Sequence, residues 1–204
     1  QCMFIIVPSP LDAGPGNTLP RPPMPPMITQ GFVDALGSDR VFLTSNPCRI
    51  RYMTQEIVIL REDLLNQMIR HCAVRPDVTD STFMAEHLVK SIIDQAHLCP
   101  LPLSSRPVLW AHDHTLWLIP TPHLIVLADK VDGYSFKYGE ATGLNPGAFG
   151  SDLSFALYAP AERSCQQCTL DPDESSTTGF PDAEIDCEDE QHRNNAPTGL
   201  HRLS

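Results

Sequence analysis

The chain has 204 residues, of which 42% are apolar and 19% charged, a composition typical of one globular domain with additional segments. Its formal net charge of −11 is uneven, because residues 1–160 hold 15 acidic and 11 basic side chains and residues 161–204 hold 10 and 3. These values exclude the overall basic surface of a protein that coats nucleic acid, and no apolar run is long enough for a membrane span.

The amino-terminal part combines a short apolar run with a proline-rich segment. The sequence begins at Gln1 without an initiator methionine, and the apolar run at residues 3–7 is too short for a signal sequence, so we expect the sequence to begin inside a domain. Eight prolines lie from Pro8 to Pro26. Because proline lacks a backbone donor and has a fixed φ, we predict neither helix nor central strand there, but a long surface connection.

The middle of the chain changes from strand patterns to helix patterns. Residues 40–45 predict a short strand, and two β-rich runs, 49–53 and 56–61, predict a hairpin that turns at Thr54-Gln55. Apolar side chains at helical spacing then predict two helices. The first is expected over 62–72, with Glu62 and Asp63 at its amino end, and the second from Ser81 to about Gln95, with Ser81 as its cap.

The last apolar segments complete the predicted sheet. After a loop that covers residues 97–107, two apolar runs follow at 108–120 and 123–130, and the second is typical of a strand covered on both faces. Residues 154–160 predict the final strand. Strands interleaved with helices indicate an α/β fold with a mixed sheet over residues 1–160, whereas the acidic tail at 161–204 is predicted to be disordered.

Two groups of side chains could bind a metal ion. His112 and His114 would share one face of a strand, with Asp113 on the other, and would need a third ligand; the alternative is that both histidines face solvent. In the tail, a second group has the spacing of a zinc site with three cysteines and one histidine, and the alternative is a disordered tail with incidental thiols. Its members are Cys165, Cys168, Cys187 and His192.

Other catalytic and binding motifs are missing from the sequence. There is no Gly-x-Ser-x-Gly elbow, and the glycines of DAGPGNT have no following lysine or helix, which excludes a P-loop. A set of arginines could touch phosphates, although alternate arginines of a hairpin more often form its solvated face. These are Arg49, Arg51, Arg61 and Arg70.

Four long stretches together have a recognisable pattern: FIIVPSPLDAGPGNTLPRPP, NPCRIRYMTQEIVILREDLLNQM, HLCPLPLSSRPVLWAHDHTLWLIPTPHLIVLADKVDGY and NPGAFGSDLSFALYAP. They resemble the carboxyl-terminal part of the B (accessory) subunits of DNA polymerase epsilon, within the family of B subunits of DNA polymerases alpha and epsilon. The resemblance covers most of residues 3–160, and the tail after about residue 160 does not share it.

The resemblance implies a calcineurin-like phosphoesterase fold, a two-sheet α/β sandwich flanked by helices, of which residues 1–160 would be the carboxyl-terminal part. Active enzymes of that fold hold two divalent cations on loops after the strands. One of these loops, Gly-Asn-His-Asp in the active enzymes, matches residues 9–12, which keep only Asp12. A later loop, Gly-His-x-His in the active enzymes, matches residues 128–131, which keep neither histidine and contain Lys130 beside Asp129. An ammonium about 4 Å from a divalent cation would be repelled by roughly 8 kcal/mol at an effective dielectric of about 20.

We therefore expect an inactivated metal site, with no catalytic, cofactor-binding or metal-binding residue. The resemblance implies a nuclear, non-catalytic accessory subunit that binds the zinc-bearing carboxyl-terminal region of the catalytic subunit. The other subunits, the replicative helicase and, through the complex, DNA would be further partners, with no membrane.

The alternative is an active metal-dependent phosphoesterase or nuclease with a site drawn from Asp12, His97, His112, His114 and Asp129. A third possibility is that the acidic tail is a binding module of its own, through zinc or through charge pairing with basic proteins.

Overall fold

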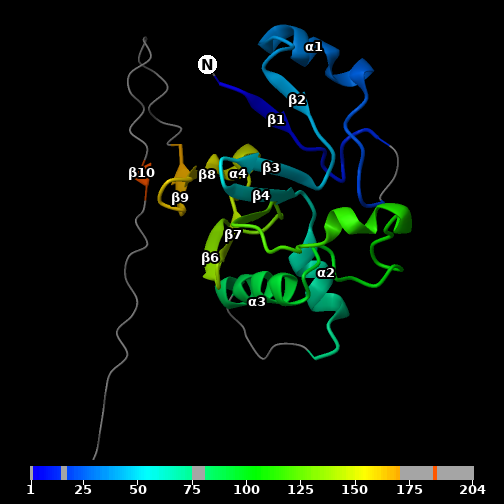
Figure 1. Ribbon diagram of the computed structural model, residues 1–204, viewed down its shortest axis with the longest axis vertical. Coiled ribbons are helices and arrows are strands. Elements are labelled where there is room, and N and C mark those ends of the chain that lie inside the picture. The colour runs from blue at the N-terminus through cyan, green and yellow to red at the C-terminus, as the bar shows by residue number, and fades with distance from the viewer. Residues whose placement is uncertain (1, 15–17, 75–80, 171–185, 188–204) are drawn as a thin grey trace, which may run out of the picture.

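A mixed five-stranded sheet with the strand order β3-β4-β5-β7-β6 forms the centre of the computed structural model, which describes residues 2–14, 18–74, 81–170 and 186–187 (Figure 1). Strands β4, β5 and β7 run parallel, and an antiparallel partner closes each side as a hairpin. The predicted α/β class with a mixed sheet is confirmed. The strands are β3 (Cys48–Tyr52), β4 (Gln55–Leu60), β5 (Leu124–Leu127), β6 (Tyr134–Tyr138) and β7 (Ala141–Asn145).

The predicted hairpin and the predicted buried strand are both present. The hairpin β3–β4 turns at Met53-Thr54, one residue earlier than expected, and Met53 has a positive φ of 52°, which suits the tight turns that join twisted strands. In β5, Leu124, Ile125 and Leu127 are buried. Because alternate side chains point to opposite faces, both faces of this strand are covered, as its composition indicated.

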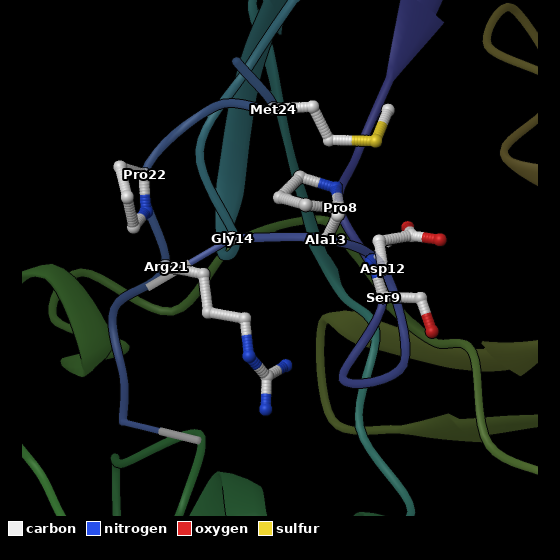
Figure 2. Close-up of a pocket in the computed structure, with 8 residues that line it drawn as sticks. All are labelled: Pro8, Ser9, Asp12, Ala13, Gly14, Arg21, Pro22 and Met24. Carbon is white, nitrogen blue, oxygen red and sulfur yellow. Dashed lines mark hydrogen bonds between the residues drawn. The ribbon is translucent and has the colours of Figure 1, made fainter. Parts of the chain in front are cut away.

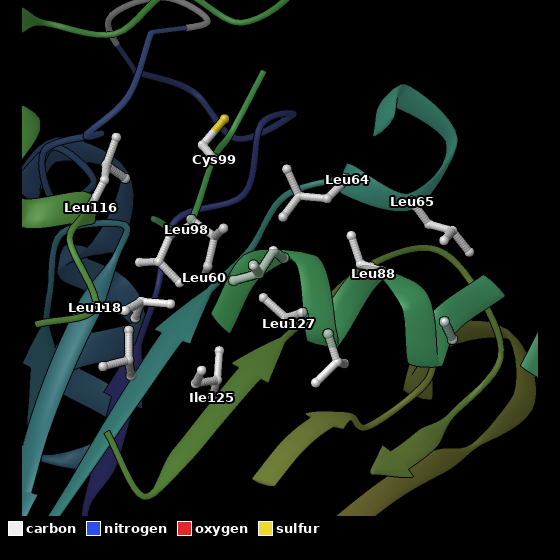
Figure 3. Packing of buried hydrophobic residues seen from close by; sticks show 14 of the residues in the cluster. Leu60, Leu64, Leu65, Leu88, Leu98, Cys99, Leu116, Leu118, Ile125 and Leu127 are labelled. Carbon is white, nitrogen blue, oxygen red and sulfur yellow. The ribbon is translucent and has the colours of Figure 1, made fainter. Parts of the chain in front are cut away.

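Both predicted helices are confirmed and cover the sheet. Helix α2 (Leu64–His71) and helix α3 (Ser81–Asp94) lie below the sheet in Figure 1, and Figure 3 shows Leu60 and Leu127 of adjacent strands beside α3. Their apolar side chains belong to one buried cluster. None of the helices in the described part of the chain is long and apolar enough to cross a bilayer.

A smaller unit at the amino end lies beside the main sheet (Figure 1). Strands β1 (Phe4–Ile6) and β2 (Val41–Leu43) pair in parallel, and helix α1 (Pro26–Leu36) connects them in the chain. No pattern in the sequence indicated α1. It begins at Pro26, the last of the eight prolines. The first residue of a helix makes no intrahelical hydrogen bond through its N–H, so proline loses nothing at this position. Within this helix Thr29 is buried, whereas Met27, Ile28 and Phe32 are exposed.

The predicted boundary between the fold and a disordered tail is corrected in the structure. Strand β8 (Ser154–Ala159) follows the short helix α4 (Phe149–Asp152), but it is not the last strand, because β9 (Ser164–Thr169) pairs with it and β10 (Asp186–Cys187) pairs with β9. Strand β9 has little apolar alternation. It is held by its backbone ladder and by Gln167, whose side-chain amide donates to the carbonyls of Tyr134 and Asn145. The remainder of the predicted disordered tail lies outside the described residues.

The apolar run at 108–120 also differs from an expected strand. Residues Trp110–Leu116 form the 3-10 helix η1, whose last residue, Leu116, is fully buried, as is Leu118 just beyond it. These two leucines anchor the segment in the core cluster. The apolar residues of the run therefore mark its anchor points, and they do not follow the alternation of a strand.

We predict that Gly143→Ala destabilises the fold, because β7 passes very close to α3. A Cβ atom at residue 143 would lie 2.5 Å from Cγ1 of Val89, which is itself buried in the core. Overpacking of this kind costs about 1–3 kcal/mol of unfolding free energy, measurable by urea denaturation. The matched control is Gly150→Ala, since a Cβ atom there would meet nothing within 4 Å. A double-mutant cycle with Val89→Ala should show coupling, and strictly additive effects would contradict the proposed contact.

Candidate functional site

The carboxyl ends of β4 and β5 are where an open α/β sheet usually binds ligands, and here several loops are fastened together at that edge. Asn46, which is fully buried, donates from Nδ2 to the carbonyl oxygens of Pro8 at 3.0 Å and Arg61 at 2.7 Å. Its Oδ1 accepts the backbone N–H of Arg61 at 3.2 Å. One amide therefore joins the loop after β1 to the loop after β4.

Asp129, one of the candidate residues in the alternative of an active phosphoesterase, holds the amino end of α2. It follows β5 closely and is 4% exposed. Its Oδ2 accepts the N–H of Leu65 at 2.7 Å, and its Oδ1 accepts the N–H of Lys130 at 2.6 Å. Burial raises the pKa of Asp129, an effect that these backbone donors oppose. Both carboxylate oxygens are thus engaged in fixing backbone.

Lys130 forms an ion pair on the adjoining loop. Its Nζ lies 2.8 Å from Oδ2 of Asp63. Arg61 places Nη1 2.9 Å from the other carboxylate oxygen of Asp63 and also donates to the carbonyl of Ala128 at 2.8 Å. Burial alone would raise the pKa of Asp63, but hydrogen bonds from Lys130 and Arg61 hold it below its ordinary value of 3.8. The cation expected to oppose metal binding is neutralised by a carboxylate of the protein itself.

A buried carboxylate lies at the same end of β4. Glu62 is 1% exposed and contacts two arginines that are also buried. Nη2 of Arg21 lies 3.0 Å from its Oε2, and Arg106 pairs with its Oε1. Glu62 was predicted at the amino end of a helix and does precede the N-cap of α2 directly, and it also joins the proline-rich segment to the loop before η1. No sequence signal separates the two roles, because the arginines are distant in the chain.

Asp12 is engaged in a turn of its own. Its Oδ2 accepts the N–H of Ser9 at 2.7 Å, and its own N–H donates to the carbonyl of Ser9 at 3.2 Å. Figure 2 shows Ser9 and Asp12 on the loop after β1, with Arg21 across a small pocket. The pocket has a volume of about 10 Å³, which is room for about one water molecule. It is too small for a phosphoryl group.

The remaining histidine candidates lie elsewhere and do not gather. Nε2 of His97 lies 3.3 Å from Asp113, whose other oxygen accepts the indole N–H of Trp117 at 2.8 Å. His112 and His114 are exposed on η1, with ring centroids 6.3 Å apart. Among the residues that the structure describes, no three His, Cys, Asp or Glu side chains are placed to hold a metal ion. The alternative of solvent-facing histidines fits His112 and His114.

Strand geometry separates the first two candidate zinc ligands of the tail. Cys165 and Cys168 both lie in β9, where residues three apart point to opposite faces of the sheet. Cys168 is buried, and burial raises the pKa of the Cys165 thiol. The backbone of Cys187 lies opposite Cys168, and His192 lies outside the described residues. The spacing Cys-x2-Cys therefore does not form the turn that a shared ion requires.

Two of the arginines that were candidates for phosphate contact make internal contacts. Nη1 of Arg49 lies 2.8 Å from Glu56, and its Nη2 donates to the carbonyls of Thr115, at 3.3 Å, and Trp117. Arg61 belongs to the loop contacts described above. Arg51 and Arg70 are exposed, which fits the alternative of a solvated surface.

Comparison with known proteins relates this arrangement to one family. The sequence profile of the family of DNA polymerase alpha/epsilon B subunits matches residues 1–135. The chain is 41% identical over 167 residues to the DNA polymerase epsilon B subunit of Arabidopsis thaliana and 43% identical over 168 residues to "DNA polymerase epsilon subunit 2" of Homo sapiens. Each alignment covers 82% of this chain and 31% of the relative. The chain thus spans about a third of the length of these relatives.

Asn46→Ala should destabilise the protein strongly, because it removes the hydrogen bonds that join two loops. The substitution leaves buried carbonyls of Pro8 and Arg61 without this donor, and we expect a loss of about 2–4 kcal/mol of unfolding free energy. Asn66→Ala is the matched control, since Asn66 is exposed on α2 and should change stability by less than about 0.5 kcal/mol. Equal stability of the two variants in urea denaturation would show that Asn46 is not a structural link.

The ion pairs of Asp63 predict an acid-dependent contribution to stability. Because the pKa of Asp63 is lowered in the folded protein, its contribution is present above the unfolded value of 3.8 and is lost as the pH falls through the folded value. Wild type should exceed Asp63→Asn by about 1 kcal/mol at pH 7, allowing for partial exposure, and the difference should shrink below about pH 4.

The comparison between wild type and this variant reports mainly on Asp63. The raised pKa of Asp129 has burial as its largest cause, with a smaller contribution from the charge of Asp63, and its contribution to stability has the opposite sign, since it is lost as the pH rises. Urea denaturation over a pH series measures the difference. A gap that stays constant from neutral to acid pH would contradict the assignment.

Proposed function

The chain belongs to the family of DNA polymerase alpha/epsilon B subunits, and we propose that it acts as part of the non-catalytic accessory (B) subunit of DNA polymerase epsilon. In this role it scaffolds the catalytic subunit during DNA replication in the nucleus. Its direct partner is the zinc-bearing carboxyl-terminal region of the catalytic subunit. The other polymerase subunits and the replicative helicase are further partners, and DNA is reached through the complex.

The observation that carries the proposal is that the groups at the ligand-binding edge of the sheet are engaged with the protein itself. Both oxygens of Asp129 accept backbone N–H groups, and Lys130 lies on Asp63. Metal-assisted hydrolysis needs carboxylates and imidazoles that face a bound ion and a substrate. Side chains that fasten loops support a role as a rigid protein surface, which loses little conformational entropy on binding.

Within that role, the fold that extends to β9 forms part of an inactive phosphoesterase-like domain of the calcineurin type, and the rest of the acidic segment follows it. The amino-terminal unit supports assembly with another protein. Its exposed apolar side chains include Ile5 and Phe42, which are neighbours across β1 and β2, and Ile28 and Phe32 of α1. Exposed apolar surface commonly marks an interaction site.

The test is co-expression of the full-length accessory subunit that contains this segment with the carboxyl-terminal region of the catalytic subunit. We expect a stoichiometric complex by size-exclusion chromatography with light scattering. Asp12→Ala should leave the complex unchanged, because the contacts of Asp12 lie within its own exposed turn. Absence of any complex for the wild-type subunit would refute the proposed role.

The competing hypothesis of an active phosphoesterase gives a different result in a second assay. The same preparation, with manganese added, is incubated with a generic phosphodiester, and we expect no turnover above the buffer rate. Turnover that is abolished by Asp12→Ala would favour the enzyme. Asp152→Ala is a suitable control, because Asp152 is also exposed and lies in α4, outside the loops at the carboxyl ends of β4 and β5.

A further inference from the structure

A groove between α2 and α3 brings together side chains that the proposed function does not use. It has a volume of about 70 Å³ and is separate from the loops at the carboxyl ends of β4 and β5. Its floor is part of the hydrophobic core, since Leu65 and Leu88 are buried members of that cluster. The groove is lined by Leu65, Met68, Ile69, Cys72, Met84, His87, Leu88 and Ser91.

Three sulfur atoms and one imidazole belong to this lining. Met68 lies in α2, Cys72 directly follows that helix as its C-cap, and Met84 and His87 are three residues apart on α3. Two segments that are separate in the sequence therefore contribute two such residues each to the lining of the groove. Cys72 is an exposed free cysteine, and its Sγ lies 3.0 Å from the carbonyl oxygen of Ile69.

The kinds of donor select the class of metal. Thioethers and thiolates bind soft ions such as Cu(I), whereas zinc sites use Cys, His, Asp and Glu. Zinc is disfavoured because the groove offers only Cys72 and His87 of that second kind. Charge favours the same ion, since one thiolate with one monovalent cation is neutral, and a divalent ion would leave a net positive charge against apolar walls.

We propose that the groove between α2 and α3 is a binding site for a single Cu(I) ion, with Cys72 as thiolate ligand and Met68, Met84 and His87 as neutral ligands. On binding, the Cys72 S–H bond breaks, a Cu–S bond forms and one proton is released to water. Copper remains Cu(I) and no electron is transferred.

The experiment titrates the 204-residue chain with Cu(I), under anaerobic reducing conditions, against a chromophoric Cu(I) chelator. We expect one equivalent to bind. Loss of a direct ligand should weaken binding by at least roughly tenfold, so Cys72→Ser should do so, as should the volume-conserving pair Met68→Leu with Met84→Leu. X-ray absorption should show at least two sulfur neighbours at copper.

Matched variants elsewhere in the chain exclude adventitious binding. Cys2→Ser and Met27→Leu alter an exposed thiol and an exposed thioether far from this groove in the sequence, and Cys165→Ser with Cys187→Ser removes tail thiols. All should keep the wild-type affinity. The site is refuted if no Cu(I) binds, if the methionine pair has no effect, or if the tail variant loses the ion. If Met68 and Met84 only pack as apolar side chains, replacing both with leucine should leave Cu(I) binding unchanged.

Discussion

The buried carboxylate of Glu62 is the constraint on which the arrangement of the loops depends. A carboxylate removed from water must be paired, and Glu62 is paired with Arg21 and Arg106, which come from segments more than 40 residues away on either side in the chain. Separating one partner from a buried pair costs about 3–5 kcal/mol. The proline-rich segment has few backbone donors of its own, so this pairing, together with Asn46, determines where it lies.

The same principle explains why the edge that usually binds ligands is closed. Asp129, Asp63 and Asn46 are the residue types that coordinate ions in other proteins, yet each is committed to a backbone group or an internal cation. A metal ion would have to displace these partners. The N–H of Leu65 at the amino end of α2 would then lose its acceptor inside the protein, which adds a desolvation cost to metal binding. Residues of these types at such an edge are therefore weak signs of metal chemistry.

Features governed by local pattern could be predicted from the sequence, and features governed by distant pairing could not. The spacing of Leu64, Leu65 and Met68 is enough to place α2, and the apolar run at 124–127 is enough to place β5. Strand β9 has no such pattern and could not be predicted in this way, since its pairing with β8 and the side-chain amide of Gln167 hold it in place. Likewise, the family resemblance drew attention to Lys130, but it did not predict the ion pair with Asp63. Asp63 lies in another loop, where the local pattern indicated only the end of a helix.

The polar side chains at the carboxyl ends of β4 and β5 have partners inside the protein, whereas the thioethers in the groove between α2 and α3 do not need such partners. A carboxylate left in a low-dielectric region finds a donor or a cation, since an unpaired charge there is costly. A thioether has no comparable requirement, because it is a weak acceptor that packs as an apolar group. Met68 and Met84 can thus line a groove against the core without being neutralised by the protein. Soft donors remain accessible to an ion in a place where hard donors would already have internal partners.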